Sequence, residues 1–294
     1  MGAAFASSAL AADLKGRPVK VAPEPEVADV PGDDIFGFTS TSDVGKAGDM
    51  GIALENDGRF GKRDGRYGVI TNKLEFGRTF TDRFWAGVSL FGAYHDMRNV
   101  TVQPIDRTMY QFDGISTEFK YKLVERSVTN PFALTAAVEP RWGRIDGGSG
   151  IHAESFSAEF KLLVDAPIVP EKLFWGFNLN WAPGVQQVVG DLSQTARSSS
   201  LNVSTALTYA ITPTFMIGAE AKYLASYGDY FFRSEQGRAF FLGPTVFWKI
   251  NDKMSLNAVL LPQIAGKSAA TPGLALDLDA FERAIFRVKF AYAF

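Results

Sequence analysis

The sequence contains no cysteine among its 294 residues and only two histidines. The missing cysteine excludes a disulfide framework and a cysteine-ligated metal centre. His95 and His152 are isolated from each other, and two scattered histidines do not make a transition-metal site. We therefore expect no metal and no cofactor.

Neither positive nor negative charge dominates the chain, because the formal net charge is −2. The chain thus lacks a global basic field, and we expect no nucleic-acid partner. It also lacks any apolar run near the roughly 18 residues that a membrane-spanning helix needs. A water-soluble β-protein and a membrane β-barrel are the two classes that remain.

What the chain has in abundance is phenylalanine, at 25 residues, and an alternation of apolar and polar side chains. Every second residue from Ala284 to Phe294 is apolar or aromatic, while Arg287 and Lys289 lie between them. A period of two indicates a strand with one apolar and one polar face. The pattern recurs and predicts roughly twelve strands. They are expected near residues 47–56, 67–78, 84–94, 115–123, 132–142, 156–164, 173–181, 201–209, 215–227, 240–250, 254–260 and 283–294.

The predicted connections are short at one end of the strands and longer at the other. The strands have about ten residues each, the length that crosses a bilayer. Tight turns at one rim and longer loops at the other are typical of bacterial outer-membrane barrels. We therefore predict an all-β fold, a transmembrane antiparallel up-and-down β-barrel over residues 47–294. The short connections are expected near 81–82, 125–130, 165–171, 212–213 and 251–252, and the longer ones near 57–66, 96–108, 145–150, 183–197, 228–237 and 265–280.

Residues 47–294 resemble a Gram-negative outer-membrane β-barrel of the porin or transporter type. The closing aromatics Phe290, Tyr292 and Phe294 resemble the C-terminal signal by which such barrels are recognised for insertion. The resemblance implies an outer-membrane location, contact with outer-membrane lipid and lipopolysaccharide, and recognition by the barrel-assembly machinery. It specifies no individual function.

The N-terminal part has a different composition. Residues 1–11 resemble the end of a secretory signal peptide, with cleavage expected before Ala12 and a true translation start upstream; an alanine-rich disordered leader is the alternative. Residues 12–46 are rich in proline and charge, which predicts a disordered tail in the periplasm. Such leaders resemble those of alphaproteobacterial outer-membrane proteins.

A soluble β-sandwich is the alternative fold, because its strands alternate as well. Long strands, unequal rims and aromatic residues near the strand ends favour the barrel. Those aromatic residues are Trp175, Trp181, Tyr209, Tyr223 and Tyr227.

The polar face carries opposite charges two residues apart on several strands. In a barrel this face is the inner one, where the charges either line a water-filled lumen or pair with one another and fill it. Bases outnumber acids in this pattern, which favours anions. The candidate lining is Lys73, Glu75, Glu118, Lys120, Lys122, Glu139, Arg141, Glu159, Lys161, Glu220, Lys222, Arg287 and Lys289.

These patterns predict a channel through which small polar solutes, anions included, diffuse. They predict no catalytic residues. A non-conducting structural or surface barrel is the second interpretation. An outer-membrane lipid hydrolase is the third, with His95 or His152 near the outer rim. His152 and Ser155 are an odd number of positions apart, so they lie on opposite faces of a strand.

Two loop segments leave their roles open. Gly147, Gly148 and Gly150 predict a tight turn. The apolar residues Leu274, Ala275, Leu276 and Leu278 predict either a constriction inside the lumen or an extension of a strand.

Overall fold

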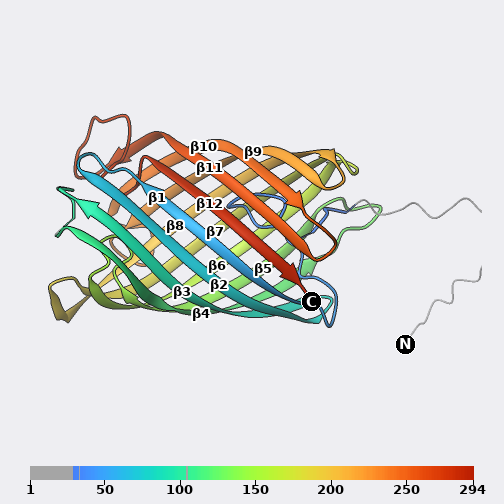
Figure 1. Ribbon diagram of the computed structural model, residues 1–294, viewed down its shortest axis with the longest axis horizontal. Helices are drawn as coiled ribbons and strands as arrows, with labels where there is room; N and C mark the ends of the chain where they lie inside the picture. Colours follow the sequence, from blue (N-terminus) through green and yellow to red (C-terminus); the bar gives the residue numbers. More distant parts are fainter. Residues whose placement is uncertain (1–28, 33, 104) are drawn as a thin grey trace, which may run out of the picture.

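The computed structural model describes residues 29–32, 34–103 and 105–294. Twelve strands form one closed antiparallel barrel, in which each strand pairs with the next and β12 pairs with β1 (Figure 1). The prediction of an all-β, twelve-stranded barrel is confirmed. In the described part of the chain no helix is long and apolar enough to cross a membrane. The strands are β1 (Met50–Phe60), β2 (Arg66–Thr81), β3 (Phe84–Arg98), β4 (Arg107–Val124), β5 (Ala133–Ile145), β6 (His152–Val169), β7 (Leu173–Val188), β8 (Asp191–Thr212), β9 (Phe215–Tyr227), β10 (Glu235–Lys249), β11 (Met254–Ser268) and β12 (Ala284–Ala293).

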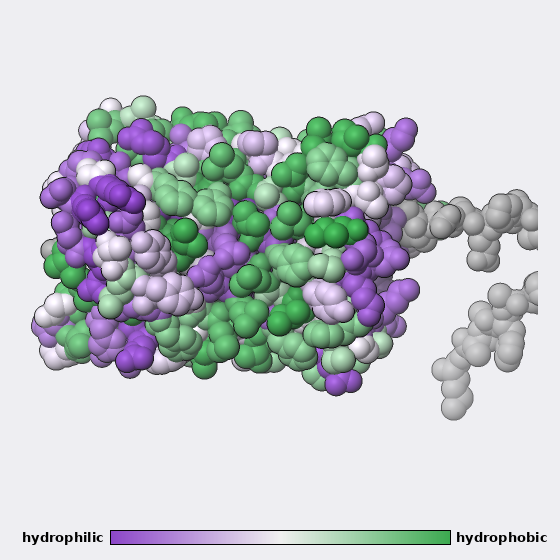
Figure 2. All heavy atoms as spheres, viewed as in Figure 1, coloured by the Kyte–Doolittle hydropathy of each residue, from purple (hydrophilic) through white to green (hydrophobic). Residues whose placement is uncertain are grey.

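The two faces of the wall follow the alternation in the sequence. The apolar set points outward: Leu90, Phe160 and Leu242 expose 50, 46 and 43% of their surface. Green apolar side chains cover most of the middle of the visible face, and purple polar ones gather at its two ends (Figure 2). A sandwich would bury this set between two sheets, so the closed barrel excludes that alternative.

One polar pair interrupts the apolar outer face of β1 and β2. Asn72 lies between the exposed Leu74 and the half-buried Ile70, and its Nδ2 donates to Oδ1 of Asn56 at 2.6 Å. Each amide therefore has a partner on the neighbouring strand, which reduces the cost of placing it in an apolar environment.

The two ends of the barrel differ, although less than the sequence predicts. We call the end with Phe294 and the connections 82–83, 125–132, 170–172, 213–214 and 250–253 the terminal rim, and the opposite end the loop rim. At the loop rim, the expected long loop 183–197 is a tight turn at 189–190, because β7 and β8 stay paired up to Val188 and Asp191. The backbones of β7 and β8 stay paired in this region although their side chains no longer alternate between apolar and polar. The sequence pattern therefore ends before the strands do.

The largest difference from the sequence prediction concerns the N-terminal tail. Residues 34–44, which we call the luminal segment, lie inside the barrel instead of in a disordered tail (Figure 1, blue). Ile35, Phe36 and Val44 are at most 2% exposed. The proline and the charges of the tail end at Asp34, and the sequence up to Asp43 is apolar or hydroxylated. Such a stretch gains from burial wherever a polar wall satisfies its backbone. Residues 1–28, with the expected signal peptide, lie outside the described residues.

At the other terminus, β12 closes the barrel against β1 and its aromatic side chains face outward. The rings of Tyr292 and Phe294 lie edge to face at 5.4 Å, and Phe294 is 62% exposed. Their role as an insertion signal, together with Phe290, stays a prediction.

Candidate functional site

The centre of the barrel holds a network of ion pairs between strands. The Lys161 ammonium on β6 lies 2.9 Å from Glu118, 2.6 Å from Glu139 and 3.3 Å from Glu159. Lys73 on β2 lies 3.7 Å from the Glu139 carboxylate on β5. Since β2 and β5 are not neighbours in the wall, this pair crosses the interior.

A second charged group lies where β1 meets β12. The Arg287 guanidinium donates Nε and Nη2 to the two Asp57 oxygens at 2.7 and 2.8 Å, and it also lies 3.0 Å from Glu55. Neither acid was among the predicted lining residues. Sequence reasoning missed Asp57 because the loop was expected to begin there. Glu55, Asp57 and Arg59 are charged and two positions apart, and this alternation in the sequence could have identified the inner face of β1.

The structure places the predicted lining residues on the inner side of the wall; that they line a conducting path stays a prediction. Their expected excess of bases is offset by acids that the pattern did not include: Glu55, Asp57, Asp113 and Asp165. The remaining contacts are Lys73 with Glu75, Lys120 with Glu118 and the Trp85 ring, Lys122 with Asp43, Arg141 with Asp113, Lys289 with Asp34, and Lys222 with the Phe38 ring.

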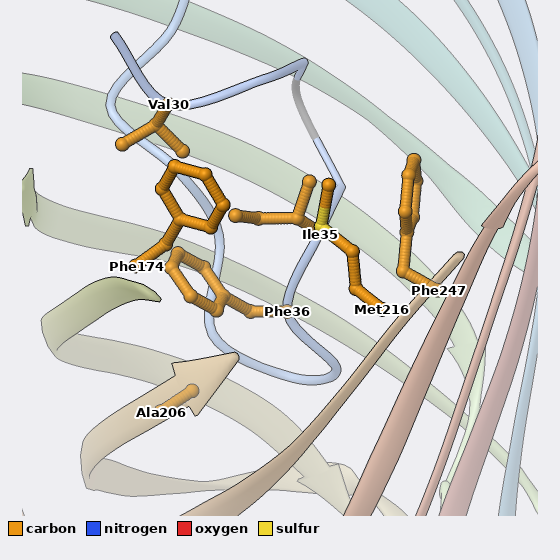
Figure 3. Close-up of a cluster of buried hydrophobic side chains, with 7 residues drawn as sticks. All are labelled: Val30, Ile35, Phe36, Phe174, Ala206, Met216 and Phe247. Atoms are coloured by element: carbon orange, nitrogen blue, oxygen red, sulfur yellow. The ribbon is translucent and has the colours of Figure 1, made fainter. Parts of the chain in front are cut away.

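The luminal segment is anchored in the wall by an apolar contact. Ile35 and Phe36 point toward Phe174 and Met216, with Phe247 beside them (Figure 3). The fit is close, because a Cβ at Gly176 would lie 2.6 Å from the Phe36 ring. The wall therefore has a recess that matches an aromatic side chain at position 36.

A buried carboxylate provides the polar anchor. Glu220 on β9 is 0% exposed. Its oxygens accept hydrogen bonds from the backbone N–H groups of Gly37 at 3.0 Å, Phe38 at 2.9 Å and Thr39 at 2.6 Å. The Thr39 hydroxyl donates a fourth, at 2.7 Å. A buried carboxylate without such donors would be strongly destabilising, so Glu220 and the segment depend on each other.

The contact at Phe36 gives a testable prediction. In the Phe36→Ala variant we expect the luminal segment to leave the wall more often. Burial of the Phe36 ring stabilises the bound segment, relative to the withdrawn one, by about 3 kcal/mol. Limited proteolysis of the folded protein should cut residues 34–44 faster. Phe231→Ala, at a ring that is 68% exposed at the loop rim, is the control; equal cleavage rates would contradict the anchoring role.

An open space remains between the luminal segment and the wall. A cavity of about 570 Å³ lies at the terminal rim, lined among others by Val44, Thr79 and Lys289. A smaller one of about 60 Å³ shares Lys289 with it and reaches Lys120 and Glu75. The open space thus extends from the terminal rim to the charged network.

At the loop rim, the β5–β6 connection folds over the interior. The Gly147 carbonyl accepts from Arg59 at 2.5 Å, and the Gly150 carbonyl accepts from Gln111 at 2.8 Å and Arg107 at 3.0 Å. The glycine segment is thus a turn, as predicted, but one held across the mouth by side chains of β1 and β4.

The β11–β12 connection folds inward as well. Gln263 on the inner face of β11 donates to the carbonyls of Asp277 and Glu282, and Lys62 lies 3.2 Å from the Glu282 carboxylate. Leu278 is 8% exposed, whereas Leu274 is 50% exposed. Of the two alternatives for this segment, the strand extension is wrong, since the strands end at Ser268 and begin again at Ala284. That the segment constricts the lumen stays a prediction.

The histidines lack the surroundings of a hydrolase. His95 is fully buried, and its Nε2 lies 3.4 Å from the Gly147 carbonyl. Within the described ranges, neither His95 nor His152 has a hydrogen bond to a serine or a carboxylate, which nucleophilic catalysis needs. The described residues also contain no group of three potential ligands that could hold a metal ion.

Comparison with solved structures shows similar barrels. The chain is similar to the COG4313 outer membrane channel from Pseudomonas putida F1, with 12% identity, a TM-score of 0.60, and coverage of 90% of this chain and 100% of that one. It is also similar to the NanC porin, with 11% identity, a TM-score of 0.48, and coverage of 82 and 98%. At these identities the likeness shows the fold alone. No curated protein matches.

A comparison with families covers almost the whole chain. Residues 28–294 match the family described as "Family of unknown function (DUF6662)". The match includes the luminal segment together with every strand of the barrel. The chain belongs to the DUF6662 family.

Proposed function

We propose that this protein is an outer-membrane channel for small polar solutes. The observation that carries the proposal is the inverted distribution of polarity: exposed apolar side chains outside, ion-paired side chains inside. A closed barrel with these two faces suits a lipid environment. The shared fold with an outer membrane channel supports it.

The orientation follows from the two rims. The terminal rim, which carries Phe294 and most of the tight turns, faces the periplasm; the loop rim faces outward. The cavity of about 570 Å³ is then the periplasmic vestibule. The luminal segment narrows the path beyond it, so the conformation described is a closed or weakly conducting one.

Withdrawal of the luminal segment changes the charge inside. Lys289 is paired with Asp34 at 2.7 Å, and Lys122 lies 3.5 Å from Asp43. Both acids belong to the segment and leave with it, while both lysines stay on the wall. The open interior is therefore more positive than the closed one around Lys122 and Lys289, and we expect this part of the path to attract anions.

Planar-bilayer recording tests the channel and its selectivity together. Under a KCl gradient, we expect the reversal potential of the open events to show a preference for Cl⁻. Replacing Lys289 and Lys122 by methionine should reduce that preference, because the unpaired positive charges are lost.

Lys249→Met is the matched control, since Lys249 forms an exposed pair with Asp252 at the terminal rim. Absence of any conductance would refute the channel, and open events that prefer K⁺ would refute the anion preference.

A further inference from the structure

The inner wall binds the luminal segment largely through its backbone. Oδ1 of Asn178 accepts from the Ser40 N–H at 2.6 Å, and Nδ2 of Asn178 donates to the Ser40 carbonyl at 2.9 Å. Both backbone groups exist at any residue except proline, so this pair recognises a peptide backbone without regard to its side chain.

Other wall side chains bind the backbone in the same way. Glu220 accepts three consecutive N–H groups. Carbonyl oxygens are bound by Thr208, which donates to Ile35 at 3.3 Å, and by Asn257, which donates to Asp34 at 3.1 Å and also to Phe36. The segment forms no strand of the sheet. These side chains therefore supply the hydrogen bonds to its backbone that a neighbouring strand supplies within the sheet.

Two positions add sequence selectivity. The recess that contains Phe174 and Met216 takes the ring at position 36. At the next position only glycine fits: a Cβ at Gly37 would lie 2.4 Å from Oε2 of Glu220 and 2.5 Å from Cβ of Val259. The wall thus selects an aromatic residue followed by glycine, within a stretch whose backbone it binds at several positions.

We propose that the inner wall of β7–β11 is a peptide-binding groove, in which the luminal segment is the resident ligand and a peptide with an aromatic–glycine pair binds in its place. The wall groups are preorganised by the barrel and buried, so they need a peptide or water whenever the segment leaves. The proposal concerns the interior of the proposed channel, but binding is measured without conduction.

The tether decides how the groove is probed. The luminal segment is joined to β1 by residues 45–49, and so short a link gives an effective concentration on the order of 1 mM. A free peptide of equal intrinsic affinity would need that concentration to compete. Weakening the resident segment about a hundredfold lowers the peptide concentration required by the same factor.

The test uses the full chain with Gly37→Ala, purified in detergent, and a fluorescein-labelled synthetic peptide of residues 34–44. Fluorescence anisotropy should show saturable binding, at least about tenfold weaker to the unmodified chain, because its own segment competes. The same peptide with alanine for its glycine should not bind. In a chain whose own segment no longer competes, Gly37→Ala combined with Phe36→Ala, adding Asn178→Ala should weaken peptide binding about tenfold, since two hydrogen bonds are lost.

Asn202→Ala, added to the same chain, is the matched control. Asn202 lies on the inner face of β8, two positions from Ser204, and in the described part of the chain no hydrogen bond joins its side-chain oxygen to the segment. It should leave binding unchanged. Phe36→Ala provides a second weakened chain if Gly37→Ala folds poorly, as judged by its heat-modified mobility on gels.

Absence of saturable binding to the weakened chains, equal binding of the glycine and alanine peptides, or no effect of Asn178→Ala in the doubly weakened chain would each overturn the groove. Recording from the same variants separates the two proposals. Conduction without peptide binding refutes the groove alone, and peptide binding without conduction refutes the channel alone.

Discussion

Replacing Glu220 by glutamine is expected to raise the time-averaged conductance of the barrel by about a hundredfold. The carboxylate accepts four hydrogen bonds from the luminal segment, two on each oxygen. Glutamine has the same shape but presents an NH₂ group in place of one oxygen, so two of the donors then face a donor. Losing hydrogen bonds to a charged acceptor costs about 1.5–3 kcal/mol each. A net loss of about 3 kcal/mol corresponds to a hundredfold larger population of the withdrawn state.

The measurement is planar-bilayer recording of the variant and the unmodified chain at equal protein concentration. Glu159→Gln is the matched control, because Glu159 also lies on the inner face and binds Lys161 and Asn180 rather than the segment. It should change the conductance little. If Glu220→Gln folds and conducts like the unmodified chain, the luminal segment does not close the interior.

Removing the central ammonium with Lys161→Met should lower the free energy of unfolding by about 3–5 kcal/mol. Lys161 is 13% exposed and shared among Glu118, Glu139 and Glu159. Methionine fills a similar volume, so the loss is electrostatic: three carboxylates lose a common cation inside the barrel. Breaking a buried ion pair from one side costs this much because the other charge stays buried and uncompensated.

Guanidinium unfolding in detergent micelles measures the effect. Lys249→Met removes an exposed pair at the terminal rim, worth about 0–1 kcal/mol, and provides the comparison. Adding Glu139→Gln to Lys161→Met should restore part of the stability, because it removes one of the uncompensated charges. Equal midpoints for Lys161→Met and Lys249→Met would show that the network is solvated and contributes little.

The strand pattern could be predicted because it depends on neighbours two positions apart. Alternation in β12 and β7 identified the outward side chains, and these side chains are indeed exposed or half-buried on the outer face. The ends of the strands were harder to predict. β11 extends to Ser268, well beyond the last alternating residue near 260, because backbone pairing at the loop rim tolerates any side chain that water or a loop can solvate.

The contents of the interior were predicted less well. The inner side chains were identified in part. Asp57 was missed because a loop was expected to begin there, and Glu55 was left out although it lies within the expected strand 47–56. The luminal segment was missed because its own composition gives no period. A short stretch without regular structure, flanked by proline and charge, is typical of a disordered tail, and only its surroundings show otherwise.

The sequence by itself determined that this chain is a twelve-stranded barrel with an apolar outside and a charged inside, because both properties follow from a local period of two. Only the tertiary structure decided that the luminal segment occupies the interior. Its anchor joins Gly37 to Glu220, 183 positions apart, and a carboxylate at that distance meets three backbone N–H groups only after the barrel has closed. Since no local pattern encodes such a contact, the state of the lumen depends on closure of the wall rather than on any one strand.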